Sequence, residues 1–115
     1  MKRLIFIVLM ALMACVSNNP KVSILNNTKN NYDSIRVFST PNTATIFKNI
    51  GPNEVINGQI FFDEKDFSDG AYSIQIYSYG KIVRQRCFGY YTNGKSLNRL
   101  IKVIIEPDTI KVTLK

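Results

Sequence analysis

The stretch Ala71-Tyr72-Ser73-Ile74-Gln75-Ile76-Tyr77 decides the fold of this chain. Its large apolar residues alternate with serine and glutamine, and a period of two places them on one face of a half-buried β-strand. The dipeptide Tyr79-Gly80 follows as a hairpin signal, and a second β-branched run occupies residues 82–88. The segment therefore predicts an antiparallel hairpin with one buried face.

Similar short runs recur at intervals of about ten residues along the chain, with Asn, Gly, Pro or Asp between them. The expected strands are 22–25, 34–38, 45–50, 55–62, 71–77, 82–88, 100–105 and 109–114. No convincing helical period follows Lys21, so we expect an all-β fold, a single antiparallel β-sandwich of about seven to eight strands over residues 21–115. Gly58 is expected to form a bulge and Gly89 to break its strand.

Composition limits the chemistry. The chain has 115 residues, which is one domain, and it has two cysteines and no histidine. The lack of histidine excludes a Ser-His-Asp triad, a Cys-His pair and a histidine-based zinc site. Two cysteines are too few for a disulfide scaffold or an all-cysteine zinc site. We therefore expect a protein that is not an enzyme, with no catalytic residues, no metal and no cofactor.

The N-terminus has the pattern of a secretory signal. Two basic residues precede an apolar stretch, 4–14, which spans roughly 16 Å as a helix and is too short to cross a bilayer. The stretch Leu12-Met13-Ala14-Cys15 resembles a bacterial lipobox. That resemblance implies cleavage before Cys15 and a diacylglycerol on its thiol. The alternative is a soluble secreted protein cut by the ordinary signal peptidase, for which Leu12 is a poor fit.

These patterns predict three parts. Residues 1–14 are a lipoprotein signal peptide, 15–20 the lipidated cysteine with a flexible tether, and 21–115 the β-sandwich domain. The stretch Asp69-Gly70-Ala71-Tyr72 resembles the late strands of small Ig-like or transthyretin-like sandwiches of extracytoplasmic bacterial proteins, which implies a fold class and no function. The expected location is the bacterial cell envelope, anchored by lipid and facing either the periplasm or the cell surface.

Basic residues gather late in the chain. Residues 81–115 hold eight basic and two acidic side chains, a balance of +6. Arg84 and Arg86 are two apart on one strand and share a face, and tyrosines follow them. A basic face with aromatic side chains can bind anionic polymers, so the candidate binding residues are Arg84, Arg86, Tyr90, Tyr91 and Asn93. The alternatives are a solvated sheet face and, for the tyrosines, side chains that cover the edge of the core.

Two further features have ordinary explanations. Cys87 lies on the face opposite the two arginines and is expected to fill the core as a small apolar side chain. The segment 63–69 holds Asp63, Asp66 and Asp69 with Glu64, which could offer oxygen ligands to calcium. The spacing does not match an EF-hand loop, so a solvated loop is expected there.

The sequence thus leaves two classes of function open. The first is a membrane-anchored, non-catalytic binding or protein-interaction module, with an envelope protein or an anionic glycan or lipid as its partner; an immunity or inhibitor lipoprotein fits it equally well. The second is a small metal-dependent or hydrolytic envelope enzyme that uses the acidic loop 63–69. Nucleic acid is not an expected partner, because the chain is exported.

Overall fold

The computed structural model describes residues 19–63 and 65–115. The predicted signal peptide, the lipidation site Cys15, most of the tether and Glu64 lie outside the described residues. Within the described part, no helix is long and apolar enough to cross a membrane. One turn of 3-10 helix covers Pro41–Thr43. The strands are β1 (Lys21–Asn26), β2 (Tyr32–Phe38), β3 (Thr45–Ile50), β4 (Val55–Gln59), β5 (Gly70–Ser78), β6 (Lys81–Thr92), β7 (Lys95–Ser96), β8 (Leu100–Ile105) and β9 (Ile110–Leu114).

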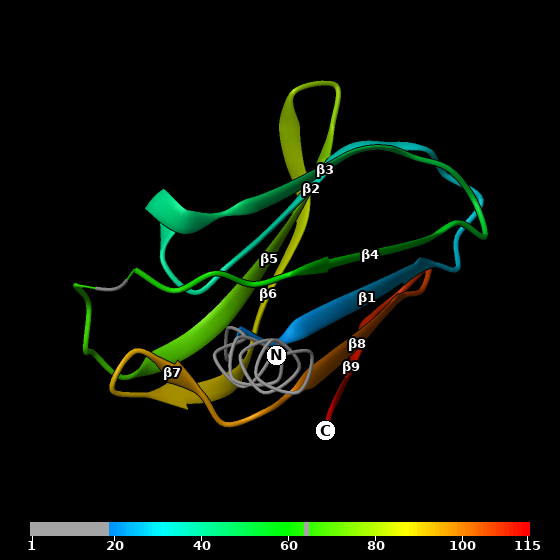
Figure 1. The fold of residues 1–115 in the computed structure, drawn as a ribbon. Coiled ribbons are helices and arrows are strands. Elements are labelled where there is room, and N and C mark those ends of the chain that lie inside the picture. The colour runs from blue at the N-terminus through cyan, green and yellow to red at the C-terminus, as the bar shows by residue number, and fades with distance from the viewer. Residues whose placement is uncertain (1–18, 64) are drawn as a thin grey trace, which may run out of the picture.

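These strands form two sheets that pack face to face (Figure 1). One sheet has the order β4-β1-β8-β9 and the other has the order β3-β2-β5-β6-β7. The predicted all-β sandwich is confirmed. Its sheets are not wholly antiparallel, however, because β1 pairs in parallel with β8, from Lys21 opposite Leu100 to Asn26 opposite Ile105. A parallel pair needs a long crossover, and the six intervening strands supply it.

The core lies between the sheets and confirms the alternation that predicts β5. Tyr72, Ile74 and Ile76 are fully buried. The opposite sheet contributes Ile24 and Val103 to the same cluster. Burial of each such side chain contributes about 1.5–3 kcal/mol, so this face supplies much of the stabilisation.

Two glycines behave differently from the sequence prediction. Gly89 does not break its strand, since β6 continues through it with φ of 66°. The register moves from Tyr72–Phe88 to Gly70–Tyr91, so β6 carries one extra residue there, as in a glycine bulge. Gly58 is not a bulge, because it pairs in regular register with Val22. A Cβ at Gly58 would lie 2.7 Å from the Phe47 ring, so glycine is needed there for space.

The predicted Tyr79-Gly80 hairpin turn is present, and Asn93-Gly94 forms a second one. Tyr79 and Gly80 have φ of 52° and 74°, and they join β5 to β6. Asn93 and Gly94 have φ of 52° and 66°, and they join β6 to β7. Two successive positive φ angles define the type I′ turn, whose twist matches that of the flanking strands.

The domain has two ends that matter for function. At the Lys21 end, where β1 begins, the Lys21 N–H donates to the Arg99 carbonyl at 2.9 Å, and the Arg99 N–H donates to the Lys115 carbonyl at 2.8 Å. The Lys29 end lies beyond Asn26, about 20 Å away along the six residues of β1. Pro20, predicted as tether, is buried, and its carbonyl accepts a hydrogen bond from the Ile60 N–H at 3.0 Å. The domain therefore begins at Pro20.

Candidate functional site

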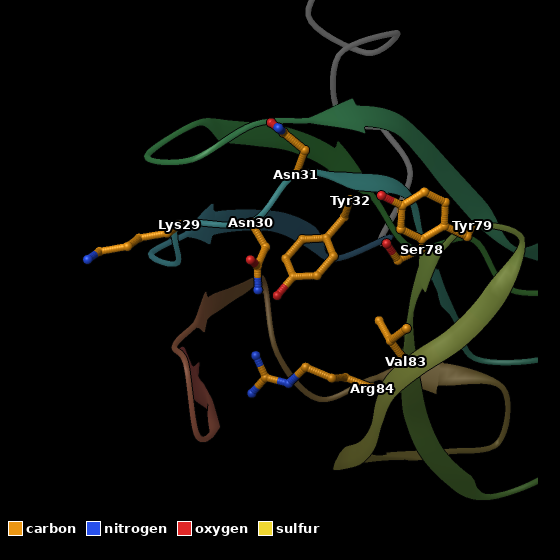
Figure 2. A pocket seen from close by; sticks show the side chains of 8 residues that line it. All are labelled: Lys29, Asn30, Asn31, Tyr32, Ser78, Tyr79, Val83 and Arg84. Atoms are coloured by element: carbon orange, nitrogen blue, oxygen red, sulfur yellow. The ribbon is translucent and has the colours of Figure 1, made fainter.

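An open pocket of about 540 Å³ lies at the Lys29 end. One wall is the loop between β1 and β2, and the other is formed by the β5–β6 hairpin (Figure 2). The side chains differ in character, with amides, hydroxyls, an aliphatic group and two cations around one opening. The lining residues are Lys29, Asn30, Asn31, Tyr32, Ser78, Tyr79, Val83 and Arg84.

A buried asparagine holds the loop wall in place. Asn26 is fully buried, and its amide nitrogen donates to the Asn30 carbonyl at 2.9 Å and to the Gly51 carbonyl at 3.0 Å. Its side-chain oxygen accepts from the Thr28 hydroxyl at 2.6 Å and from the Thr28 N–H at 3.2 Å. A buried polar group whose donors and acceptors are satisfied makes its surroundings rigid. The wall is therefore formed before any ligand arrives.

Tyr32 and Arg84 form the charged part of the pocket. Figure 2 shows the Tyr32 hydroxyl directed toward Asn30 and the Arg84 guanidinium, with Lys29 extending outward at the rim. Burial raises the pKa of the Tyr32 hydroxyl, but hydrogen bonds with Thr28, Arg84 and Asn30 and the positive charge of Arg84 bring the net pKa below its ordinary value. A site that stabilises a phenolate also favours other oxyanions.

The opposite wall is the Tyr79-Gly80 turn. The Gly80 N–H donates to an Asp33 carboxylate oxygen at 3.2 Å, which ties the turn to the start of β2. Tyr79 is 95% exposed. Its exposed ring lines the pocket, so it is a candidate contact for a ligand.

The predicted roles of Arg84 and Arg86 need correction. They do share a face, but it is the inner one, because Arg84 is opposite Ile76 and Arg86 is opposite Ile74, two core residues. Arg84 Nη1 donates to the Glu106 carbonyl at 2.5 Å, and Arg86 Nη1 donates to the Ile110 carbonyl. The two arginines therefore join the sheets along the open side of the sandwich. Only Arg84 also reaches the Tyr32 pocket.

The other predicted binding residues lie elsewhere. Tyr91 is buried, so its predicted role as a contact residue is wrong; its hydroxyl donates to the Ser39 carbonyl at 3.3 Å and its ring meets Phe62 edge to face. Tyr90 is 51% exposed. Asn93 is exposed in the β6–β7 turn. These positions are roughly 20–30 Å from Arg84 along β6, so the candidates do not form one site.

Cys87 is exposed, so the prediction that it fills the core is wrong. It is opposite Ser73, whose hydroxyl oxygen lies 3.6 Å from the Cys87 sulfur. Because Arg84 and Arg86 occupy the inner phase of β6, the alternate phase that holds Cys87 faces solvent. The sequence pattern correctly separates the two phases, but it does not reveal which one faces inward.

The acidic loop packs against the β6–β7 turn. Asp69 Oδ1 accepts from the Asn93 N–H at 2.9 Å, Asp66 Oδ1 from the Ser68 N–H at 2.9 Å, and Asp63 Oδ1 from the Lys65 N–H at 3.0 Å. Hydrogen bonds with Ser68 hold the pKa of Asp66 below its usual value. Over residues 19–63 and 65–115, no group of three or more acidic, cysteine or histidine side chains is placed to hold a metal ion.

Comparison with known proteins shows no family for this chain. No protein-family model matches the chain, and no curated protein matches it. Among solved structures, it is similar to a protein from Eubacterium rectale determined by NMR, with 14% sequence identity over 85% of this chain and 89% of that chain and a TM-score of 0.49. The class defined by the described residues is a two-sheet β-sandwich with a polar, cationic pocket at one end.

Sequence reasoning missed most of the pocket. Lys29 and Asn30 belong to a polar run that is typical of any turn, and Tyr32 lies just before the predicted second strand. No local pattern shows that this turn faces residues some fifty positions later. Packing of the two sheets brings Tyr32 and Arg84 together, which is a long-range effect.

Proposed function

We propose that this protein is a lipid-anchored, non-catalytic binding module of the bacterial cell envelope. Its ligand carries a phosphate or carboxylate group that enters the Tyr32 pocket at the Lys29 end. The observation that carries this proposal is the convergence of Tyr32 and Arg84 in an open cavity of about 540 Å³.

The chemistry of the pocket supports an anionic group. Arg84 presents a planar, permanently charged fork of donors, which suits phosphate and carboxylate geometry. Lys29 adds a second cation at the rim, and Asn30 and Ser78 are neutral hydrogen-bonding groups. No acidic side chain lines this pocket in the part of the chain that the structure describes. The lining therefore favours an anion over a cation.

The anchor rests on the lipobox-like stretch that ends at Cys15. Two acyl chains on that residue would hold the domain at a membrane without any inserted helix. The Lys21 end would then face the lipid, since it is nearest to Cys15, and the Tyr32 pocket would face away from it.

Mass spectrometry of the protein recovered from a bacterial envelope tests the anchor. We expect the mature chain to begin at Cys15 and to carry diacylglycerol, and a Cys15→Ala variant to stay uncleaved and unmodified. A mature chain that begins elsewhere, without lipid, would contradict the anchor and leave the pocket to be judged by its own test.

Amide NMR shifts test the pocket, with inorganic phosphate and glucuronate as probes. We expect shifts at 29–32 and 78–84 in the wild type, and weaker binding in Tyr32→Phe and Lys29→Gln, which remove a hydroxyl and a charge. Lys48→Gln on β3 is the matched control and should bind as the wild type does. Equal binding by all four proteins, or no shift at these residues, would exclude the pocket as an anion site.

A further inference from the structure

We propose that the Lys21 end of the sandwich is a membrane-facing surface that binds the anionic headgroups of the bilayer in which the anchor sits. The surface consists of Lys21, Lys95, Leu97 and Arg99, called here the Lys21 face. The proposal deepens the proposed function, since it assumes the lipid on Cys15, and it assigns the orientation of the anchored domain to these side chains.

Three separate segments bring these residues together. Lys21 begins β1, Lys95 begins β7, and Arg99 precedes β8. The Lys21 N–H donates to the Arg99 carbonyl at 2.9 Å, which holds the backbones of these two residues next to each other. A shallow hollow of about 430 Å³ lies among the three, and Leu97, Ser96, Asn98 and Asn19 complete its lining.

The cations of this face are exposed, and no ion pair joins them to another residue of 19–63 or 65–115. In residues 19–63 and 65–115, the one ion pair joins Lys111 to Glu106, at 3.3 Å and at the other end of β9. Lys21, Lys95 and Arg99 are all exposed. Their charges are therefore available to lipid phosphates, which lie within the Debye length of about 8–10 Å once the face meets the surface.

Leu97 gives the face an apolar contact. Its side chain is 62% exposed, although cations surround it on the β7–β8 loop. An exposed leucine among basic residues is typical of surfaces that rest on the lipid headgroup region, where the apolar group enters and the cations contact phosphate. Leu97 is too exposed to contribute to the core of the domain.

The length of the tether places this face at the bilayer. Pro20 is buried in the domain, so residues 16–19 alone separate it from Cys15. Fully extended, this segment reaches about 17 Å. The chain leaves the domain between Asn19 and Lys21, both of which line the hollow. The Lys21 face is therefore the part of the domain that the anchor brings closest to the lipid.

The acidic loop limits this surface on one side. Asp69 lies near Lys95, because it accepts a hydrogen bond from the Asn93 N–H in the turn before β7. Asp63, Asp66 and Asp69 each accept a backbone N–H, so their carboxylates are directed at the loop and the turn. This loop repels an anionic surface and therefore favours a tilt that presents Lys21 and Arg99 first.

The test uses the lipidated protein in vesicles of phosphatidylcholine, with or without phosphatidylglycerol. Cys87→Ser removes the exposed thiol, and Asn98→Cys then carries an environment-sensitive dye beside Leu97. We expect the dye to be brighter and blue-shifted with phosphatidylglycerol, and the change to reverse with salt. A dye on Pro52→Cys, which lies beside Lys29 at the opposite end but does not line the Tyr32 pocket, should not respond.

Charge variants identify the residues involved. Lys21→Glu/Lys95→Glu/Arg99→Glu should abolish the response, because each cation near an anionic surface contributes about fivefold to partitioning. The matched control, Lys48→Glu/Lys81→Glu/Lys102→Glu, makes the same change in net charge on exposed residues elsewhere and should retain it.

The outcomes separate this proposal from the anchor. An Asn98 dye that responds equally in both kinds of vesicle, or not at all in a protein shown to be lipidated, would overturn the Lys21 face while leaving the anchor intact. The comparison of the two kinds of vesicle uses a protein that keeps the wild-type cations, so it tests the Lys21 face even if a charge variant fails to fold. Absence of lipid on Cys15 would instead refute the anchor.

Discussion

The guanidinium of Arg84 on β6 donates a hydrogen bond to the backbone carbonyl of Glu106 at 2.5 Å. Glu106 directly follows β8, which belongs to the other sheet. Two residues along β6, Arg86 makes the equivalent contact with the Ile110 carbonyl. On this side of the sandwich no strand of one sheet pairs with a strand of the other. β9 is an edge strand, and β6 has an unpaired edge at Arg84 and Arg86, because it pairs with β7 only at Tyr91 and Thr92. The arginines therefore close the sandwich where backbone pairing does not.

Replacement of these arginines should destabilise the domain. We expect Arg84→Ala and Arg86→Ala each to lower the free energy of unfolding by about 1–3 kcal/mol, because a charged hydrogen bond is lost and a carbonyl loses its donor. Urea denaturation provides the measurement. Lys102→Ala, at the exposed position of β8, is the control, with a change within about 0.5 kcal/mol. Unfolding curves identical to the wild type would show that the bridges contribute nothing.

Alanine substitutions at three glycines separate the cost of backbone strain from the cost of steric overlap. Gly80→Ala meets only the positive φ of 74°, because no atom lies within 4 Å of the added Cβ. Gly58→Ala meets only the Phe47 ring, at 2.7 Å. Gly89→Ala meets both a φ of 66° and the Tyr72 ring, at 3.0 Å.

We expect Gly80→Ala to cost about 1–2 kcal/mol and Gly89→Ala to cost more, since backbone strain and displacement of a core ring add together. Thermal or urea unfolding of the three variants provides the comparison. If Gly89→Ala were the mildest of the three, the bulge would not have the tight packing described above.

Native alkylation tests the position of Cys87. Because its side chain is exposed on the outer face of β6, we expect iodoacetamide to modify it completely without denaturant. Cys87→Ser should have a stability close to that of the wild type, since the thiol fills no core volume. Protection of the thiol until the domain unfolds would place Cys87 in the core after all.

Alkaline pH should destabilise the domain through its buried tyrosines. Burial raises the pKa of Tyr72, and burial together with Asp66 and Asp69 raises that of Tyr91. Their contribution to stability is complete below the ordinary pKa of about 10 and is lost as pH rises through the higher folded value. Tyr32 has a lowered pKa and offsets part of this loss, since its contribution is present above its unfolded pKa.

A titration of tyrosinate absorbance checks these directions. We expect one tyrosine to ionise early and two to ionise late, and Arg84→Gln to raise the pKa of the early one. Tyr72→Phe should remove one late titration. A folded protein whose tyrosines all titrate together at the ordinary value would contradict the contacts around Tyr32, Tyr72 and Tyr91.

Calcium should not stabilise the protein. The carboxylates of Asp63, Asp66 and Asp69 each accept a backbone N–H, so we expect the melting temperature to be the same with calcium as with a chelator. A rise of several degrees would instead favour the metal-dependent alternative. Asp69→Asn, which preserves an acceptor for the Asn93 N–H, should then show whether any such rise depends on this loop.

Much of the fold follows from local pattern. The alternation around Ile74 predicts β5 and its buried face, because the pleat of a strand has a period of two whatever the strand packs against. The Tyr79-Gly80 and Asn93-Gly94 turns follow from local backbone preference. The predicted strand ranges agree with the structure to within a few residues, apart from β6, which runs through Gly89, and the two-residue β7.

The pocket and the roles of Arg84, Arg86, Tyr91 and Cys87 do not follow from such patterns. Alternation separates the two faces of β6 but does not show which is inner, and a charged residue on an inner face is unexpected until a carbonyl from another sheet is seen beside it. The parallel pairing of β1 with β8 brings together ends of the chain that are some eighty residues apart. Local physical chemistry thus specifies the strands, their turns and the expected export signal. Contacts between distant segments decide which face is buried, where Tyr32 meets Arg84, and which cations gather at the Lys21 end.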